Sequence, residues 1–136
     1  MSLENITTYE SCSAVKEIMQ AVLNHGCTLI QDSKKVTTYA TPIGHRFGIV
    51  WVSSGVKRES DESSCHVLPI AVAFNPDVIT IEALPTLDPS LKGKVYKNSN
   101  LKGFPSGQTT PTKYGFLVQV ENTETLLRIL DKYNAL

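Results

Sequence analysis

Helix-forming patterns near both ends of this 136-residue chain enclose a run of strand-forming segments, and this order restricts the folds open to it. Gly26 supplies the left-handed residue that ends the first helix, and Ser11 or Ser13 can cap its start. Asn122 or Thr123 can cap the second helix. The apolar stripes of the two helices have helical spacing and consist of Val15, Ile18, Met19, Val22 and Leu23, and of Leu126, Leu127, Leu130 and Tyr133.

Strand-forming segments rich in β-branched and aromatic residues fill the region between the helices. Short polar turns separate the first three, which predicts an antiparallel meander. Pro69 lies inside the fourth segment and indicates an edge or a bulge, because proline cannot donate to a β-ladder. The six predicted strands are 27–31, 36–40, 47–52, 67–74, 78–84 and 114–120.

The expected fold is α+β, with a bent, mainly antiparallel sheet of about six strands and both helices on one face. Two helices cannot cover both faces of such a sheet. The other face must therefore be polar, closed by curvature or covered by a partner. Because the segment 47–52 is apolar on both sides, one hypothesis is a homodimer formed through an exposed sheet face. No repeat or second core is visible, so residues 1–136 are interpreted as one domain.

Composition predicts a soluble protein. Apolar residues make up 41% of the chain and charged residues 19%, and no apolar stretch of about 18 residues is present to span a bilayer. We therefore expect no membrane partner. The first residues lack the basic and apolar regions of a secretory signal, which predicts a cytoplasmic location.

Charge is unevenly distributed along the sequence. The segment 89–120 contains five of the thirteen basic residues and none of the thirteen acidic ones, so eight basic and thirteen acidic residues lie elsewhere. The five are all lysines: Lys92, Lys94, Lys97, Lys102 and Lys113. Tyr96, Phe104 and Tyr114 are interleaved with them. This pattern is typical of a surface that meets phosphates or another anionic surface.

The lysines belong mostly to a predicted long basic loop, residues 85–112, and a second predicted loop, residues 53–64, is charged and mobile. The main functional hypothesis is a non-catalytic module in which the five lysines, Tyr96 and Phe104 contact a nucleic acid or an acidic protein surface. The segment has no arginine, which favours contact with the nucleic-acid backbone over reading of bases. The alternative is that the lysines only solvate a loop that the aromatic residues attach to the body.

A small-molecule site is the second hypothesis. Tyr39, Phe47 and Trp51 would form the walls of a pocket in the concave face of the sheet, with the long loop as a lid, in a binding protein or a small enzyme. Packing in the core is the other role open to Trp51.

Catalytic, metal and cofactor signatures are absent from the sequence. The segment 103–110 lacks the Gly-Lys-Ser/Thr of a phosphate-binding loop, and neither a metal-ligand spacing nor a nucleophile motif is present. Asp77 and Glu82 are interpreted as a turn residue and a solvent-facing strand residue. We therefore expect no catalytic residue, no metal and no cofactor.

The three cysteines, Cys12, Cys27 and Cys65, are expected to be reduced, because three cannot all pair within one chain. Cys27 is expected to be buried as a small hydrophobic residue. Cys65 follows the polar run 59–64 and is the one thiol for which reactivity stays open.

Overall fold

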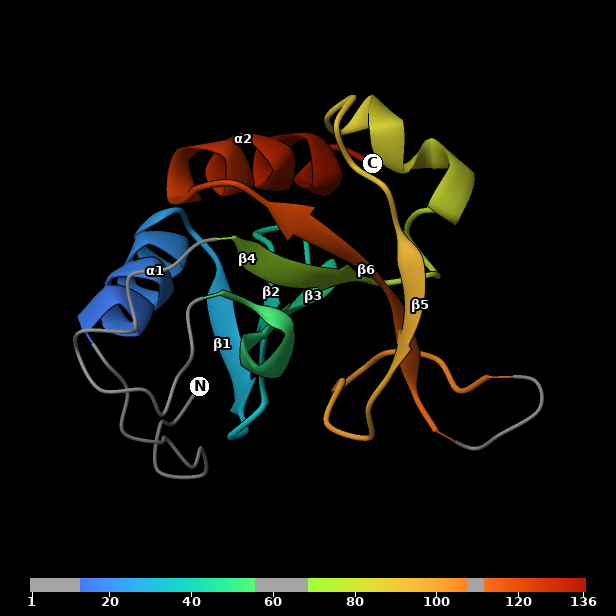
Figure 1. Cartoon of the computed structure of the whole chain (residues 1–136), viewed down its shortest axis with the longest axis horizontal. Helices are drawn as coiled ribbons and strands as arrows, with labels where there is room; N and C mark the ends of the chain where they lie inside the picture. The colour runs from blue at the N-terminus through green and yellow to red at the C-terminus, as the bar shows by residue number, and fades with distance from the viewer. Residues whose placement is uncertain (1–12, 56–68, 108–111) are drawn as a thin grey trace.

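The computed structural model describes residues 13–55, 69–107 and 112–136 (Figure 1). Its helices are α1 (Ser13–Asn24) and α2 (Thr123–Asn134), and its short 3-10 helices are η2 (Trp51–Ser53) and η3 (Ile81–Thr86). The strands are β1 (Thr28–Asp32), β2 (Val36–Ala40), β3 (Arg46–Val50), β4 (Ile70–Phe74), β5 (Lys94–Lys97) and β6 (Tyr114–Val120).

The six strands form one antiparallel sheet in the order β1-β2-β3-β4-β6-β5. The sheet is not closed, so β1 and β5 are its edges and lie at opposite sides of the molecule (Figure 1). The predicted α+β class, with an N-terminal and a C-terminal helix, is confirmed. The helix ends also follow the sequence signals, because Gly26 has a φ of 93° and the Asn122 side chain accepts a hydrogen bond from the Thr125 N–H.

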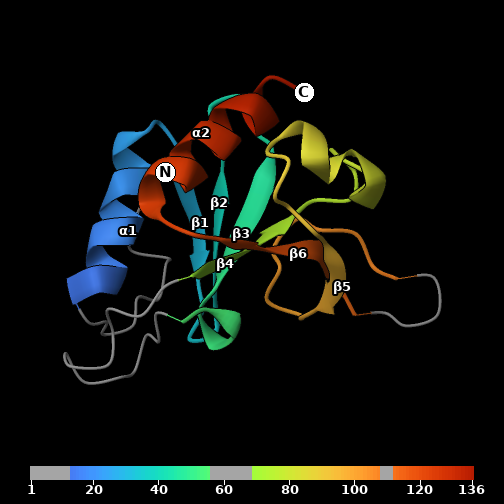
Figure 2. The ribbon, with the colours of Figure 1, turned by 45° about the horizontal axis from the view of Figure 1, so that its top comes forward.

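Both helices cover the same face of the sheet (Figure 2). Their buried side chains join the main core together with alternate residues of β2, β3, β4 and β6. The segment 79–91 covers the rest of this face and adds Ile79, Leu84, Leu87 and Leu91 to the same core. The helix-covered face is therefore closed by α1, α2 and a stretch that contains η3.

The second face of the sheet is covered by the chain's own connection between β5 and β6. Leu101 and Phe104 from this connection are 0% and 4% exposed. They form a second, smaller core with residues of the central strands, namely Val36, Val50, Ala71, Ala73 and Leu117. Covering by the chain itself was not among the three options derived from the sequence. A homodimer through this face stays a prediction, and it would require the connection to move.

Two glycines of the sheet make room for the connection. A Cβ at Gly48 would lie 3.2 Å from Leu101 Cδ2, and a Cβ at Gly115 would lie 2.8 Å from Phe104 Cε2. Both approaches are closer than ordinary van der Waals contact, so the missing Cβ atoms are what admits these side chains. We call residues 98–107 the docked connection and Leu101 and Phe104 its anchors.

The prediction of a strand at 78–84 is wrong, because this segment forms a turn followed by η3. The N–H groups of Val78 and Ile79 both bond to the carbonyl of Asn75, and the Asn75 side chain accepts from the Asp77 N–H. The Asn-Pro-Asp sequence therefore ends β4 in a turn that does not return as a hairpin. Thr80 then caps η3, which contains Pro85 and places Leu84 in the core, whereas Ile79 packs from the turn that precedes this 3-10 helix.

Two further boundaries differ from the prediction. The segment 85–112 is not a continuous loop, because it contains β5, which pairs with residues 114–117 of β6. The third strand ends at Val50, and Trp51 begins η2. The Trp51 N–H still bonds to the carbonyl of Lys35 in the register of the β2–β3 ladder, but the Trp51 carbonyl accepts from the Ser54 N–H, which closes a 3-10 turn and ends the strand.

No helix within the described residues is both long enough and apolar enough to cross a membrane. Several predictions lie outside the described residues, namely those on Cys12 and Cys65, most of the 53–64 loop and the first part of the strand predicted at 67–74.

Candidate anion-binding edge

The five lysines lie on and around the edge strand β5. Lys94 and Lys97 begin and end β5, and Lys92 precedes it by two residues. Lys102 lies on the docked connection, and Lys113 immediately precedes β6, where its carbonyl accepts from the Asn98 N–H. We call these five residues the basic edge. The fold thus brings together residues that are up to 21 positions apart in the sequence.

The lysines border the edge from both sides of the sheet. Lys94 is opposite Leu117, a residue of the second core, whereas Lys97 is opposite Tyr114 in the same ladder. Since side chains alternate along a strand, Lys94 and Lys97 lie on opposite faces. The charge therefore surrounds the rim of the sheet, and a partner that meets all five lysines must approach the edge and not one flat face.

The positive charge of the basic edge is not neutralised locally. Within the described part of the chain, none of the five ammonium groups has a carboxylate within 4.0 Å. Lys92, Lys94, Lys97 and Lys102 are exposed, and Lys113 is half-buried. Unpaired lysines that share one region repel each other, and an anion that approaches them relieves this repulsion.

Arg46 adds a sixth cation that the sequence did not associate with this region. Its Nη1 donates to the carbonyl of Lys102 at 3.3 Å, and its side chain lies against Gly103, whose φ is 85°. The Thr38 hydroxyl donates to the carbonyl of Asn100 at 3.3 Å. Side chains of β2 and β3 thus hold the backbone of the docked connection, which fixes the position of Lys102 relative to the sheet.

The aromatic residues of this region are attached to the body of the protein. Phe104 is 4% exposed and packs in the second core, so stacking on a base would require its release. Tyr96 is half-buried against the same core, and its hydroxyl accepts from Asn98 Nδ2 at 3.0 Å. Tyr114 is half-buried and edge-on to Phe116, with ring centroids 6.0 Å apart. In this arrangement the lysine side chains are accessible to a partner, whereas the aromatic rings are largely packed against the protein.

The residues of the predicted small-molecule pocket lie in the main core. Tyr39, Phe47 and Trp51 are 0%, 0% and 1% exposed, and the rings of Tyr39 and Phe47 stack at 5.6 Å. The Trp51 indole donates to the Thr37 hydroxyl at 2.8 Å, which in turn donates to the buried Asp32 at 2.7 Å. A pocket among these residues stays a prediction, and it would require packed core side chains to separate.

Cys27 is a free, buried thiol, as expected from the sequence. Burial, and secondly the negative charge of Asp131, raise the pKa of the Cys27 thiol to about 11. This thiol therefore stays protonated at neutral pH and is a poor nucleophile. Among the described residues, no three His, Cys, Asp or Glu side chains are gathered in a way that could hold a metal ion.

Alkaline pH is expected to destabilise the fold through Cys27. In the unfolded chain the thiol ionises near its ordinary pKa of 9.0, whereas in the folded protein it ionises near 11. Between these values the unfolded state has lost a proton that the folded state keeps, so the free energy of unfolding falls as pH rises. Urea midpoints measured at pH 8, 9, 10 and 11 should therefore decline more steeply for the wild type than for Cys27→Ala. Equal slopes would show that Cys27 is not the cause.

A scan against protein-family models and searches of curated proteins and of solved structures found no match.

Proposed function

We propose that this protein binds an anionic partner at its basic edge, and that a single-stranded nucleic acid is the first partner to test. The observation that supports this most is the gathering of five lysines around one strand with no carboxylate within 4.0 Å in the described residues. Extended polyanions present a row of phosphates, and such a row can follow a strand edge that carries positive charge on both sides.

The proposed contact is with phosphates and not with bases. Lysine acts as a point charge, and Arg46, an arginine that lies beside the edge, already donates to the carbonyl of Lys102. Phe104 is buried and Tyr96 is packed against the second core, so neither ring is free for base stacking in this arrangement. Binding should therefore depend strongly on salt and weakly on sequence.

The salt dependence of binding tests this proposal. If all five lysines contact phosphates of a labelled single strand of about 20 nucleotides, the logarithm of the affinity should fall with the logarithm of salt with a slope of about −3.5. Raising salt from about 50 to about 200 mM should then weaken binding about a hundredfold in a fluorescence anisotropy titration. Each of Lys94→Gln and Lys97→Gln should reduce the slope by about 0.7.

Lys16→Gln is the matched control, because Lys16 is an exposed lysine on α1, at the side of the molecule opposite β5 (Figure 1). Its slope should equal that of the wild type. If no binding occurs at about 50 mM salt, or if Lys16→Gln weakens binding as much as Lys94→Gln, the proposal is wrong. The lysines of β5 would then serve to keep an edge strand from pairing with other chains.

A further inference from the structure

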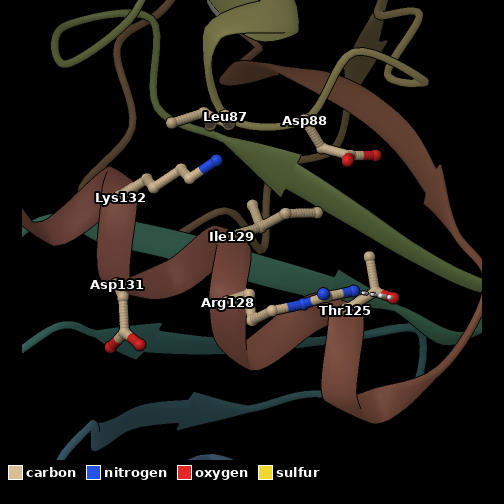
Figure 3. A pocket seen from close by; sticks show the side chains of 7 residues that line it. All are labelled: Leu87, Asp88, Thr125, Arg128, Ile129, Asp131 and Lys132. Atoms are coloured by element: carbon tan, nitrogen blue, oxygen red, sulfur yellow. Dashed lines mark hydrogen bonds between the residues drawn. The ribbon is translucent and has the colours of Figure 1, made fainter.

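A groove lies between α2 and the segment 87–91, which follows η3 (Figure 3). It consists of two adjoining cavities of about 330 and 340 Å³, which share Asp88, Thr125 and Arg128 in their walls. Each cavity is within the size range of small-molecule sites, which begins at about 300 Å³. The groove is separate from the basic edge, since none of the five lysines lines it.

Arg128 and Asp88 are the two charged residues that line both cavities, and within the described part of the chain they do not pair with each other. Among the described residues, the Arg128 guanidinium has no carboxylate within 4.0 Å, although Asp88 lies across the opening from it (Figure 3). Arg128 Nη2 donates to the Thr125 hydroxyl at 3.2 Å, and a guanidinium has four more N–H donors to offer. Asp88 Oδ2 accepts from the Ser90 hydroxyl, which leaves Oδ1 as an acceptor for a ligand.

The other charged residues of the first cavity reinforce this polarity. Lys132 is one helical turn beyond Arg128 on α2 and extends the positive wall, with its side chain reaching toward Leu87 (Figure 3). Asp131 also lines this cavity, but its carboxylate is bound to His25 Nε2 at 2.7 Å and points away from Asp88 (Figure 3). The helix α2 therefore presents Arg128 and Lys132 to the groove, whereas Asp88 on the 87–91 side, and Glu121 at the wall of the second cavity, present carboxylates.

We propose that the groove binds a small amphoteric molecule of the free amino-acid class, with its carboxylate at Arg128 and its ammonium at Asp88. A guanidinium and a carboxylate that face one opening without touching complement a ligand that carries both charges. A ligand with only an anionic group would leave Asp88 facing a like charge, and one with only a cationic group would face Arg128 and Lys132. The opposed charges thus select for the zwitterion.

Isothermal titration of the whole chain tests the proposal in two stages. The free amino acids are titrated singly, and the one that binds best is compared with the carboxylic acid that lacks its amino group and with the amine that lacks its carboxyl group. Each analogue should bind at least about tenfold more weakly than the amino acid. Arg128→Gln and Asp88→Asn should each weaken binding of the amino acid by about tenfold or more, and Lys16→Gln should leave it unchanged.

Two results would overturn the proposal: no heat of binding for any amino acid at up to about 10 mM, or a deaminated acid that binds as tightly as the amino acid. Both results come from the wild-type protein, so they do not depend on how well a variant folds. Oligonucleotide binding should be the same in Arg128→Gln, Asp88→Asn and the wild type if the two sites are separate. Either proposal can therefore fail without the other.

Discussion

Replacing Phe104 with alanine is expected to lower the free energy of unfolding by about 3 kcal/mol, the low end of the range for buried phenylalanines. Phe104 is 4% exposed and lies against Gly115, where no Cβ separates its ring from the backbone of β6. Without the ring, the second core keeps Leu101 as its sole anchor from the docked connection. Urea denaturation followed by tryptophan fluorescence measures the loss, and Phe104→Leu, which keeps most of the apolar volume, should cost about 1 kcal/mol.

A double-mutant cycle with Gly115 identifies the cause of that loss. In the wild-type background, Gly115→Ala places a Cβ 2.8 Å from the Phe104 ring and should cost about 1–3 kcal/mol, as overpacking does. In the Phe104→Ala background the same Cβ meets no ring, so Gly115→Ala should cost clearly less. Equal costs in the two backgrounds would mean that Phe104 does not occupy the space above Gly115.

Replacing Tyr133 with phenylalanine, which removes only the hydroxyl, is expected to lower the free energy of unfolding by about 2–3 kcal/mol. This is a large effect for a single oxygen atom. Tyr133 is 0% exposed and lies on α2, where its hydroxyl donates to the carbonyl of Arg46 at 2.6 Å and accepts from the Asn75 N–H at 3.1 Å. It thus connects α2 with the start of β3 and the residue that follows β4. Tyr133→Phe would leave a buried donor and a buried acceptor without this partner, which costs more than the bond itself contributes.

Tyr96→Phe is the matched control for Tyr133→Phe, because it removes the same atom from a half-buried ring whose hydroxyl accepts one hydrogen bond, from Asn98 Nδ2. Its cost in urea denaturation should be under about 1 kcal/mol. Similar losses for the two variants would contradict the bridging role of Tyr133. Burial also raises the pKa of the Tyr133 hydroxyl well above its usual value, as expected for a group that the fold holds in its protonated form.

Local sequence signals were sufficient for much of the fold. The strands predicted at 36–40 and 114–120 have the same bounds as β2 and β6, because polar turns flank β-branched residues there. The prediction of a strand at 78–84 was wrong although the apolar residues there have a composition typical of strands. The turn at Asn75 and the N-cap at Thr80 direct this segment into a 3-10 helix. β5 has four residues, two of them lysines, and becomes a strand only through pairing with β6.

The lysines of the candidate site could be identified from composition, whereas their arrangement in space could not. The absence of acidic residues from 89–120 is visible in the sequence, and the lysines of that segment do gather around β5. Their division between the two sides of the edge depends on the β5–β6 register, which no local pattern encodes. The contacts of Leu101 with Gly48 and of Phe104 with Gly115 join distant residues, and so does the approach of Arg46 to Lys102. These contacts arise only when the chain is folded.

Mapping the bound surface by NMR tests the central claim that the basic edge receives the anionic partner. Isotope-labelled protein is titrated with a single-stranded oligonucleotide of about 20 nucleotides at about 50 mM salt. The largest changes in backbone amide shifts are predicted at residues 92–104 and 113–115, and about 200 mM salt should reverse them. Changes centred on α1, changes spread evenly over the sheet, or no changes at all would contradict the claim.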